Sequence, residues 1–134
     1  MEFCFFKNEK KELINLINNS FNMDNREENF ILQPYQRFLL LKDNELVIGA
    51  SLITEKYDPI KKVKTMYLDY VCISDKYRGK GLGEKLMLEI IKIAKEENFN
   101  RIQLTSSKKR VCARNLYQKL GMKIVDTDIF VKEL

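Results

Sequence analysis

The sequence predicts an α/β (α+β) fold in which a mixed, mostly antiparallel central sheet of six to seven strands is flanked by about four helices. Three observations support this prediction. Strand-like and helix-like apolar patterns follow one another in the order β-α-α-β-β-β-α-β-α-β-β. The strand–turn–helix–strand unit over residues 66–105 is a right-handed crossover, which requires a parallel neighbouring strand. Residues 82–98 carry the strongest helical pattern of the chain.

The first part of the chain predicts one strand and two helices. Residues 1–6 form the strand, and Asn8 is expected to cap a helix that runs to about Asn19. The sequence Asp24-Asn25-Arg26-Glu27 is a capping-box pattern for a second, short helix. Residues 22–34 are the least determined part, and Pro34 closes them. The apolar stripe of the first helix consists of Leu13, Leu16, Ile17 and Phe21.

The middle of the chain predicts a meander of three strands and then the strongest helix. Residues 35–42 and 45–56 form a hairpin, in which Gly49 is a possible bulge. Residues 61–74 form the longest strand and are expected to continue the meander. The helix at residues 82–98 has apolar side chains at helical spacing, namely Leu82, Leu86, Met87, Ile90, Ile91, Ile93 and Ala94.

The last part of the chain predicts three short strands around one helix. Ile102 and Leu104 alternate with polar residues as one strand, and the helix runs from about Arg110 to Leu120 and ends before Gly121. Residues 122–125 and 129–131 are expected to give two final strands. No repeat, linker or low-complexity tract appears, so residues 1–134 are expected to form a single domain.

Composition limits the classes of function. Hydrophobic residues make up 45% of the chain and charged residues 32%, as in ordinary soluble proteins. The net charge of +5 favours anionic ligands over polycationic ones. The lysines are scattered, and the densest basic cluster, residues 108–110, lacks interleaved aromatic residues, so no nucleic-acid partner is expected. No apolar run is long enough to span a membrane and no leader pattern is present, so a cytoplasmic protein with no membrane partner is expected.

The reactive residue types limit the chemistry further. The chain has no histidine, which excludes Ser-His-Asp and Cys-His nucleophile systems and histidine metal sites. Any general base is then a carboxylate, a tyrosine or a group that acts through water. The three cysteines, Cys4, Cys72 and Cys112, are far apart, so neither a disulfide framework nor a metal site is expected.

One basic, glycine-rich stretch stands at the centre of the chain. Residues 77–83, Tyr-Arg-Gly-Lys-Gly-Leu-Gly, hold three of the five glycines and lie between a strand and a helix. A glycine-rich turn that opens a helix presents unpaired backbone N–H groups to a phosphate. The spacing fits neither a P-loop nor a dinucleotide-binding turn. The alternative is a solvated basic turn whose glycines serve packing.

The pattern Arg78-x-x-Gly81-x-Gly83 resembles the acyl-CoA-binding motif of the GNAT superfamily of N-acyltransferases. The order of predicted elements also matches the GNAT fold from end to end, and the resemblance is most specific over residues 68–122. The resemblance implies that this turn holds the pyrophosphate of coenzyme A. The residues expected to bind the cofactor there are Arg78, Gly79, Lys80, Gly81, Leu82 and Gly83.

A second motif, residues 113–122, resembles the family signature Ala-x-x-Phe-Tyr-x-x-x-Gly-Phe. The resemblance implies that Tyr117 lies near the coenzyme sulfur, where a protonated tyrosine can donate its proton to a departing thiolate. The alternative is a tyrosine that only packs in the core. Family members often carry an Asn at the position of Arg110, so Arg110 and Asn115 are both candidates for contact with coenzyme A.

Asp69 is the candidate general base. It falls where many family members carry Glu on the strand before the pyrophosphate turn. An acceptor ammonium must lose a proton before it can attack, and a carboxylate can take that proton directly or through water. The alternative is an Asp that binds the substrate cation or a neighbouring side chain. Other polar groups considered for the role are Tyr67, Tyr70 and Glu55.

The backbone of the same strand is the expected binding site for the pantetheine arm. The resemblance implies that Val71, Cys72 and Ile73 contact the coenzyme through main-chain groups, and that an N–H there polarises the thioester carbonyl. Cys72 itself is expected to be a buried structural thiol, because no histidine is present to activate it. Because no acyl-cysteine intermediate is then expected, the acyl group is expected to pass directly from the coenzyme to the amine in a ternary complex.

The leading hypothesis is therefore an acetyl-CoA-dependent N-acetyltransferase that needs no metal and acts on a small-molecule or protein amine, as a monomer or homodimer. The alternative is a non-catalytic acyl-CoA-binding regulatory module, and a nucleic-acid-binding protein ranks last. The resemblance implies that residues 22–36 and 56–64 set the acceptor. Residues 77–83 also look like those of glucosamine-phosphate acetyltransferases, but polyamines, amino sugars, amino acids and protein amines all remain open.

Overall fold

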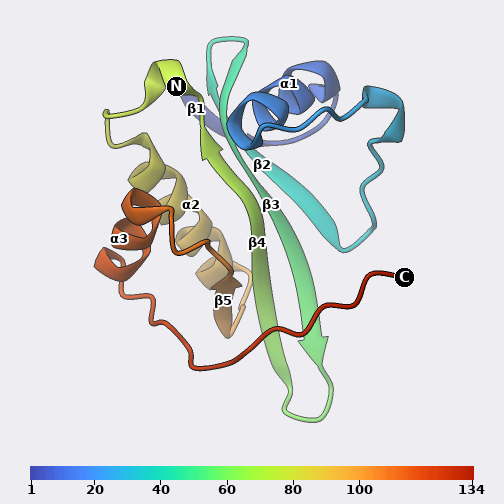
Figure 1. The fold of residues 1–134 in the computed structure, drawn as a ribbon, viewed down its shortest axis with the longest axis vertical. Helices are drawn as coiled ribbons and strands as arrows, with labels where there is room; N and C mark the ends of the chain where they lie inside the picture. The colour runs from blue at the N-terminus through green and yellow to red at the C-terminus, as the bar shows by residue number, and fades with distance from the viewer.

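A five-stranded mixed sheet forms the centre of this computed structural model, which describes residues 1–134 (Figure 1). The sheet order is β1-β2-β3-β4-β5, antiparallel throughout except that β5 runs parallel to β4 after the α2 crossover. The strands are β1 (Glu2–Phe5), β2 (Gln36–Asp43), β3 (Leu46–Asp58), β4 (Val63–Ile73) and β5 (Arg101–Leu104). The helices are α1 (Lys10–Phe21), α2 (Leu82–Glu96) and α3 (Val111–Lys119), with 3-10 turns η1 (Glu27–Asn29) and η2 (Asp75–Tyr77).

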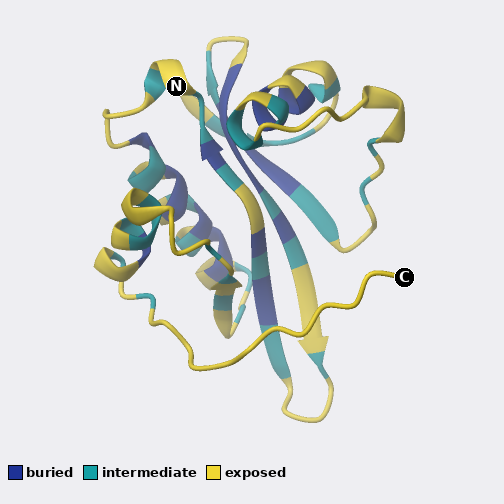
Figure 2. Cartoon of the chain, in the orientation of Figure 1, coloured by how far each residue is buried: buried dark blue, intermediate teal, exposed yellow.

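Helices cover both faces of the sheet. Because successive side chains of a strand point to opposite faces, a sheet covered on both faces needs strands that are apolar at every position. The continuous apolar run of β2 meets this need, and its alternate side chains enter the cores on opposite faces. Phe38 and Leu40 pack with α1, whereas Leu39 packs with α2 and α3. The core under α2 contains Leu86, Met87, Ile90, Ile93 and Ala94 of that helix. In Figure 2 the buried residues follow the sheet and the inner faces of the helices. None of the three helices has both the length and the apolar character that crossing a bilayer requires.

The mixed, mostly antiparallel sheet is confirmed, but the expected six to seven strands and four helices are wrong. The sheet has five strands and the chain has three α-helices. The two missing strands are residues 122–125 and 129–131, which form no helix or strand. Their composition favours a strand, but an extended segment becomes one only when its backbone pairs with a neighbour, and no neighbour pairs with it here.

The missing helix is the one expected after residue 24, where only the single turn η1 forms. The Asn25 N–H donates to Asn18 Oδ1 at 2.9 Å, and Asn18 Nδ2 donates to the Asn25 carbonyl at 3.1 Å. These bonds tie the segment back to α1 instead of capping a new helix. The expected Asn8 cap is also wrong, because the N-cap residue of α1 is Glu9.

A shielded ion pair joins the start of α1 to β2. The Glu9 carboxylate pairs with the Lys42 ammonium, and their side chains are only 12% and 13% exposed. The carboxylate also accepts the N–H groups of Lys7 and Asn8, at 2.9 and 3.0 Å. Burial by itself would raise the pKa of Glu9, but the Lys42 ammonium and the backbone donors outweigh it and lower the pKa to about 2.

This pair predicts an acid-sensitive contribution to stability. Because the folded pKa lies below the ordinary value of 4.5, the stabilisation is fully present above pH 4.5 and is lost as the pH falls toward 2. Glu9→Gln is expected to lower the free energy of unfolding by about 2 kcal/mol at pH 7 and to flatten its dependence on pH in that window. Urea unfolding at several pH values measures both. Glu12→Gln, an exposed change on the same helix, is the control, and equal losses in the two variants would contradict the prediction.

Candidate active site

The glycine-rich stretch forms an open turn between η2 and α2. Gly79 and Gly81 have φ values of +76° and +74°, which only glycine adopts without strain. A Cβ at either position would have no atom within 4 Å, so both glycines face open space. Gly81 is the N-cap of α2 and makes no side-chain cap. The first N–H groups of α2 therefore lie free at the positive end of the helix.

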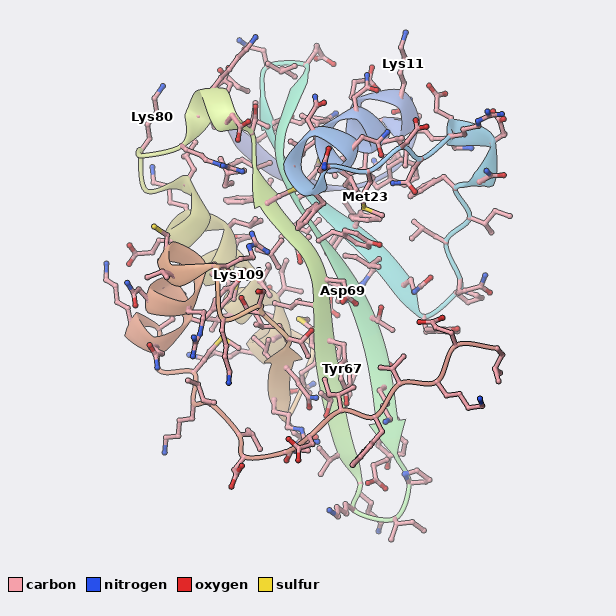
Figure 3. All side chains as sticks on the ribbon, viewed as in Figure 1. Lys11, Met23, Tyr67, Asp69, Lys80 and Lys109 are labelled. Carbon is pink, nitrogen blue, oxygen red and sulfur yellow. The ribbon has the colours of Figure 1, made fainter.

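The basic side chains of this turn differ in how they are held. Arg78 is tied to its own turn, since it pairs with Asp75 at 2.8 Å and its Nε donates to the Ile73 carbonyl at 3.3 Å. The Lys80 ammonium lies 5.3 Å from the centroid of the Tyr77 ring and makes no ion pair. Figure 3 shows Lys80 pointing away from the body of the protein. The turn thus combines free backbone donors with one available cation.

A bulge interrupts β4 just before this turn. Cys72 pairs with Ala50 and Asp69 pairs with Leu52, so two β4 residues, Tyr70 and Val71, face one β3 residue. Tyr70 has a φ of +52°, a left-handed conformation that is uncommon for a side chain of this size. The ring of Phe21, at the end of α1, packs edge-to-face on Tyr70 with centroids 5.5 Å apart. The bulge brings an aromatic pair and Asp69 to one place on the sheet.

Beyond this point β4 has lost its neighbour on one side. The β4–β5 pairing ends at Leu68 and Leu104, although β4 continues to Ile73. The Ser74 N–H donates to Ile48 O on β3 at 2.7 Å. Because backbone groups alternate in direction along a strand, the N–H groups of Ile73 and Val71 face the gap, and that of Cys72 faces β3. The contact of Arg78 with the Ile73 carbonyl agrees with this direction.

A cavity of about 500 Å³ lies at this gap. It brings together Asp69 and Val71 of β4 with Arg110 and Tyr117 of the α3 region, all of which the sequence had singled out. Figure 3 labels Asp69 on β4. Its other lining residues are Phe21, Leu68, Tyr70, Leu104 and Thr105. Sequence reasoning assigned no role at the site to Phe21, Leu104 or Thr105. Phe21 carried only the signal of an apolar helix stripe, and the packing of α1 against the bulge brings it here.

Tyr117 reaches the cavity from the inner face of α3. The residue is only 8% exposed, and its hydroxyl makes no hydrogen bond to the protein. Burial raises the pKa of Tyr117, and the charge of Arg110 offsets this only in part. The hydroxyl is therefore protonated at neutral pH and is free to donate a hydrogen bond to a bound molecule.

Arg110, the N-cap residue of α3, also lines the cavity. Its guanidinium group is 5.4 Å from the centroid of the Phe21 ring and makes no ion pair. A chain of contacts thus runs from Arg110 through Phe21 to Tyr70. Asn115, the other candidate on α3, is exposed and lies outside the lining of the cavity.

The remaining candidates lie away from the cavity. Cys72 is buried against α1, as expected, and burial raises the pKa of its thiol. Glu55 pairs with Lys64 at 3.6 Å, and the Lys56 ammonium lies 5.7 Å from the centroid of the Tyr67 ring. Neither Glu55 nor Tyr67 lines the cavity, so Asp69 is its only carboxylate.

Known proteins with similar sequences are acetyltransferases. N-acetyltransferase 8B from Homo sapiens is 25% identical over 93 residues, 69% of this chain and 41% of the relative. A spermine/spermidine N(1)-acetyltransferase from Bacillus subtilis (strain 168) is 34% identical over 67 residues, 49% of this chain and 44% of the relative. This chain is thus matched to less than half the length of these relatives.

Similarity of fold extends over the whole chain. A ribosomal-protein-alanine N-acetyltransferase from Brucella melitensis biovar Abortus 2308 superposes with a TM-score of 0.85 at 14% identity, covering 100% of both chains. The sequence profile of the acetyltransferase (GNAT) family matches residues 6–122. That range contains the glycine turn, the bulged strand and Tyr117, and the chain therefore belongs to the GNAT acetyltransferase family.

Proposed function

We propose that this protein is an acetyl-CoA-dependent N-acetyltransferase that acetylates a primary amine by direct transfer in a ternary complex. The observation that carries the proposal is the cavity where β4 separates from β5. A carboxylate, a protonated tyrosine and unpaired strand backbone meet there, one short turn from a free helix N-terminus. These are the groups needed to bind an acyl thioester, deprotonate an amine and protonate a thiolate.

Three features of the chain fit coenzyme A. The open space over Gly79 and Gly81 gives a pyrophosphate access to the N–H groups at the start of α2. The gap beside β4 exposes the N–H groups of Val71 and Ile73 to an extended amide-containing arm. Ser106 Oγ, in the loop next to the cavity, is the one buried side-chain polar atom without a hydrogen-bond partner. An orphaned polar atom at this place is consistent with a ligand that satisfies it.

The proposed residue roles follow from these positions. Bound acetyl-CoA supplies an acetyl group activated as a thioester. Asp69 accepts a proton from the acceptor ammonium, which frees the nitrogen lone pair to attack the acetyl carbon. A backbone N–H of the bulged strand, from Val71 or Ile73, stabilises the negative charge that develops on the acetyl oxygen. As the carbon–sulfur bond breaks, Tyr117 donates its proton to the sulfur, and the new amide nitrogen gives up its extra proton to solvent, from which Tyr117 is reprotonated.

The acceptor is sought with a panel of amines, scored by release of free CoA from acetyl-CoA. The names of the relatives suggest two classes to include, polyamines and peptides that begin with alanine. Amino sugars and free amino acids complete the panel. Amine-dependent CoA release supports the proposal. Tight coenzyme binding with no release for any amine would favour the acyl-CoA-binding module instead.

Lys80→Glu tests the phosphate site. Because Lys80 is the available cation beside the free N-terminus of α2, charge reversal is expected to weaken CoA binding about tenfold or more. Wild-type protein should gain thermal stability with CoA, as for any ligand of the native state. Thermal-shift titration measures both effects. Lys92→Glu, the same charge change on the exposed face of α2, should leave CoA affinity unchanged. An equal loss of affinity in this control would show that the effect comes from the net charge of the protein and not from the turn.

A direct transfer predicts that no acetyl-cysteine forms. Cys72 is buried on the α1 side of the sheet, and Cys112 is exposed on α3 but does not line the cavity. Protein incubated with acetyl-CoA and no acceptor should keep the mass of all three cysteines unchanged by peptide mass spectrometry. An acetylated Cys72 or Cys112 that turns over on addition of amine would instead establish a two-step reaction.

A further inference from the structure

The cavity beside β4 holds two opposite charges that have no partner in the protein. Asp69 is its only carboxylate and Arg110 its only cation. Neither side chain takes part in any ion pair or side-chain hydrogen bond of the chain. The two therefore do not pair with each other, although they line the same cavity. The proposed reaction uses Asp69 and leaves the charge of Arg110 without a function.

Aromatic contacts hold the Arg110 guanidinium group at the cavity wall. It lies over the Phe21 ring, 5.4 Å from the centroid, and Phe21 packs edge-to-face on Tyr70 with centroids 5.5 Å apart. A cation over an aromatic face is attracted through its charge, so its N–H groups stay free for another partner. A guanidinium group held in place before binding loses less conformational entropy when it binds. It suits a carboxylate or a phosphate, whose two oxygens accept paired hydrogen bonds from it.

Arg110 lies near the group that is proposed to protonate the sulfur. Its positive charge offsets part of the effect of burial on the pKa of Tyr117, which requires the guanidinium group to be close to that hydroxyl. The end of the coenzyme that reaches Tyr117 is neutral, because the pantetheine arm carries amides and the charged groups of coenzyme A are phosphates. In the proposed function the pyrophosphate binds at the turn before α2. An anion that meets Arg110 in the cavity therefore comes from the acceptor.

We propose that the acceptor is a small primary amine that also carries an anionic group, with its ammonium at Asp69 and its anion at Arg110. This inference rests on the proposed function and specifies its substrate class. The cavity of about 500 Å³ falls within the range of small-molecule sites, roughly 300–1,000 Å³, so a single small molecule can contact both side chains. A polyamine brings only positive charge and is repelled by the guanidinium group. The net charge of +5 acts in the same direction.

Matched acceptors that differ only in the anion test the proposal. Glycine, β-alanine and γ-aminobutyrate, in which the amine and the carboxylate are increasingly far apart, are each compared with their carboxamides in CoA release from acetyl-CoA. Phosphoethanolamine is compared with ethanolamine, so the series distinguishes a carboxylate from a phosphate. In at least one pair the wild type should favour the anionic amine in kcat/KM by about tenfold or more. No such preference in any pair, or a preference for spermidine over all of them, would overturn the proposal.

Arg110→Gln assigns the preference to this side chain. The ratio of the kcat/KM values within the favoured pair should fall about tenfold, because glutamine is polar but carries no charge. Comparing this ratio between two proteins cancels any difference in amine pKa between the paired acceptors. Arg110 makes no side-chain cap of α3, so the variant is expected to fold. Lys109→Gln is the control, since it removes the same charge from an exposed neighbour outside the cavity and should leave the ratio unchanged.

A role for Arg110 in coenzyme binding gives a different result. Arg110→Gln would then weaken CoA binding in a thermal-shift titration and leave the acceptor ratio unchanged, which would overturn the proposal. Failure of the proposed function is separate, because no amine then releases CoA. In that case isothermal titration of the same pairs into CoA-saturated protein decides. Binding of an anionic amine that Arg110→Gln abolishes would support the anion site, and absence of such binding would exclude it.

Discussion

Replacing Tyr117 by Phe is expected to slow acetyl transfer by roughly a hundredfold or more while coenzyme affinity stays nearly constant. The change removes one hydroxyl and leaves a buried ring whose packing in the core under α2 is unaltered. No hydrogen bond to the protein is lost, because the hydroxyl makes none. If the hydroxyl serves to protonate the departing sulfur, its loss matters in the transition state and hardly at all in the bound ground state.

Two measurements on Tyr117→Phe separate catalysis from binding. Steady-state turnover with a productive acceptor gives the rate, and thermal-shift titration with CoA gives the affinity. Tyr77→Phe is the matched control, because that hydroxyl lies at the start of the glycine-rich turn and donates to Asp43 at 2.8 Å, away from the cavity. Near-normal turnover in Tyr117→Phe would make the residue structural. A large loss of CoA affinity would make it a binding residue.

The central unit of the fold, from β4 through the turn to α2 and β5, was predictable because its signals are local. Gly79 and Gly81 have positive φ, and glycine is the residue type that adopts this conformation without strain. The apolar spacing of residues 82–98 places the buried face of α2 without knowledge of the rest of the chain. A helix between two adjacent strands then allows a parallel pair only, and β4 and β5 are parallel.

Failures of the prediction come from interactions that are distant in sequence. Residues 122–131 have strand composition, yet whether they pair depends on a partner edge that composition does not specify. The short helix expected after residue 24 does not form, because the segment instead makes hydrogen bonds between Asn18 and Asn25. These bonds require that α1 is already in place. In both cases the local preference was real and another contact decided the outcome.

At the candidate site, too, local motifs were predictable and contacts between distant parts of the chain were not. Tyr117, Asp69 and Arg110 were singled out from motifs, and the structure brings them to one cavity, but their chemical roles remain predictions. The bulge at Tyr70 could not be predicted, since a tyrosine in a left-handed conformation carries no signal in the sequence. The packing of Phe21 on that tyrosine is a tertiary contact across the sheet. The part of the cavity that the sequence did not predict is therefore the part formed by tertiary contacts of the bulge with α1.

Replacing Asp69 by Asn is expected to reduce kcat/KM about a hundredfold or more near pH 7, and the deficit should shrink as the pH rises. A primary amine with a pKa of about 10 is almost entirely protonated at pH 7, so a base must remove its proton before attack. Asparagine cannot accept that proton. As the pH approaches the pKa of the amine, solvent delivers the free amine, and the carboxylate becomes dispensable.

Separate pH profiles of kcat and of KM for the amine decide between the two roles open to Asp69. If Asp69 only attracts the acceptor ammonium, Asp69→Asn raises KM for the amine and leaves kcat near the wild-type value, and this difference in KM disappears at high pH because the neutral amine is no longer attracted. If Asp69 is the base, kcat at saturating amine falls at pH 7, and the kcat values of variant and wild type converge between about pH 7 and 10. Glu55→Gln is the control, since it removes a carboxylate on the neighbouring strand β3 that lies outside the cavity. Because Asp69 is the only carboxylate lining the cavity, a loss of kcat at pH 7 that disappears as the pH rises would assign the proton transfer to this side chain.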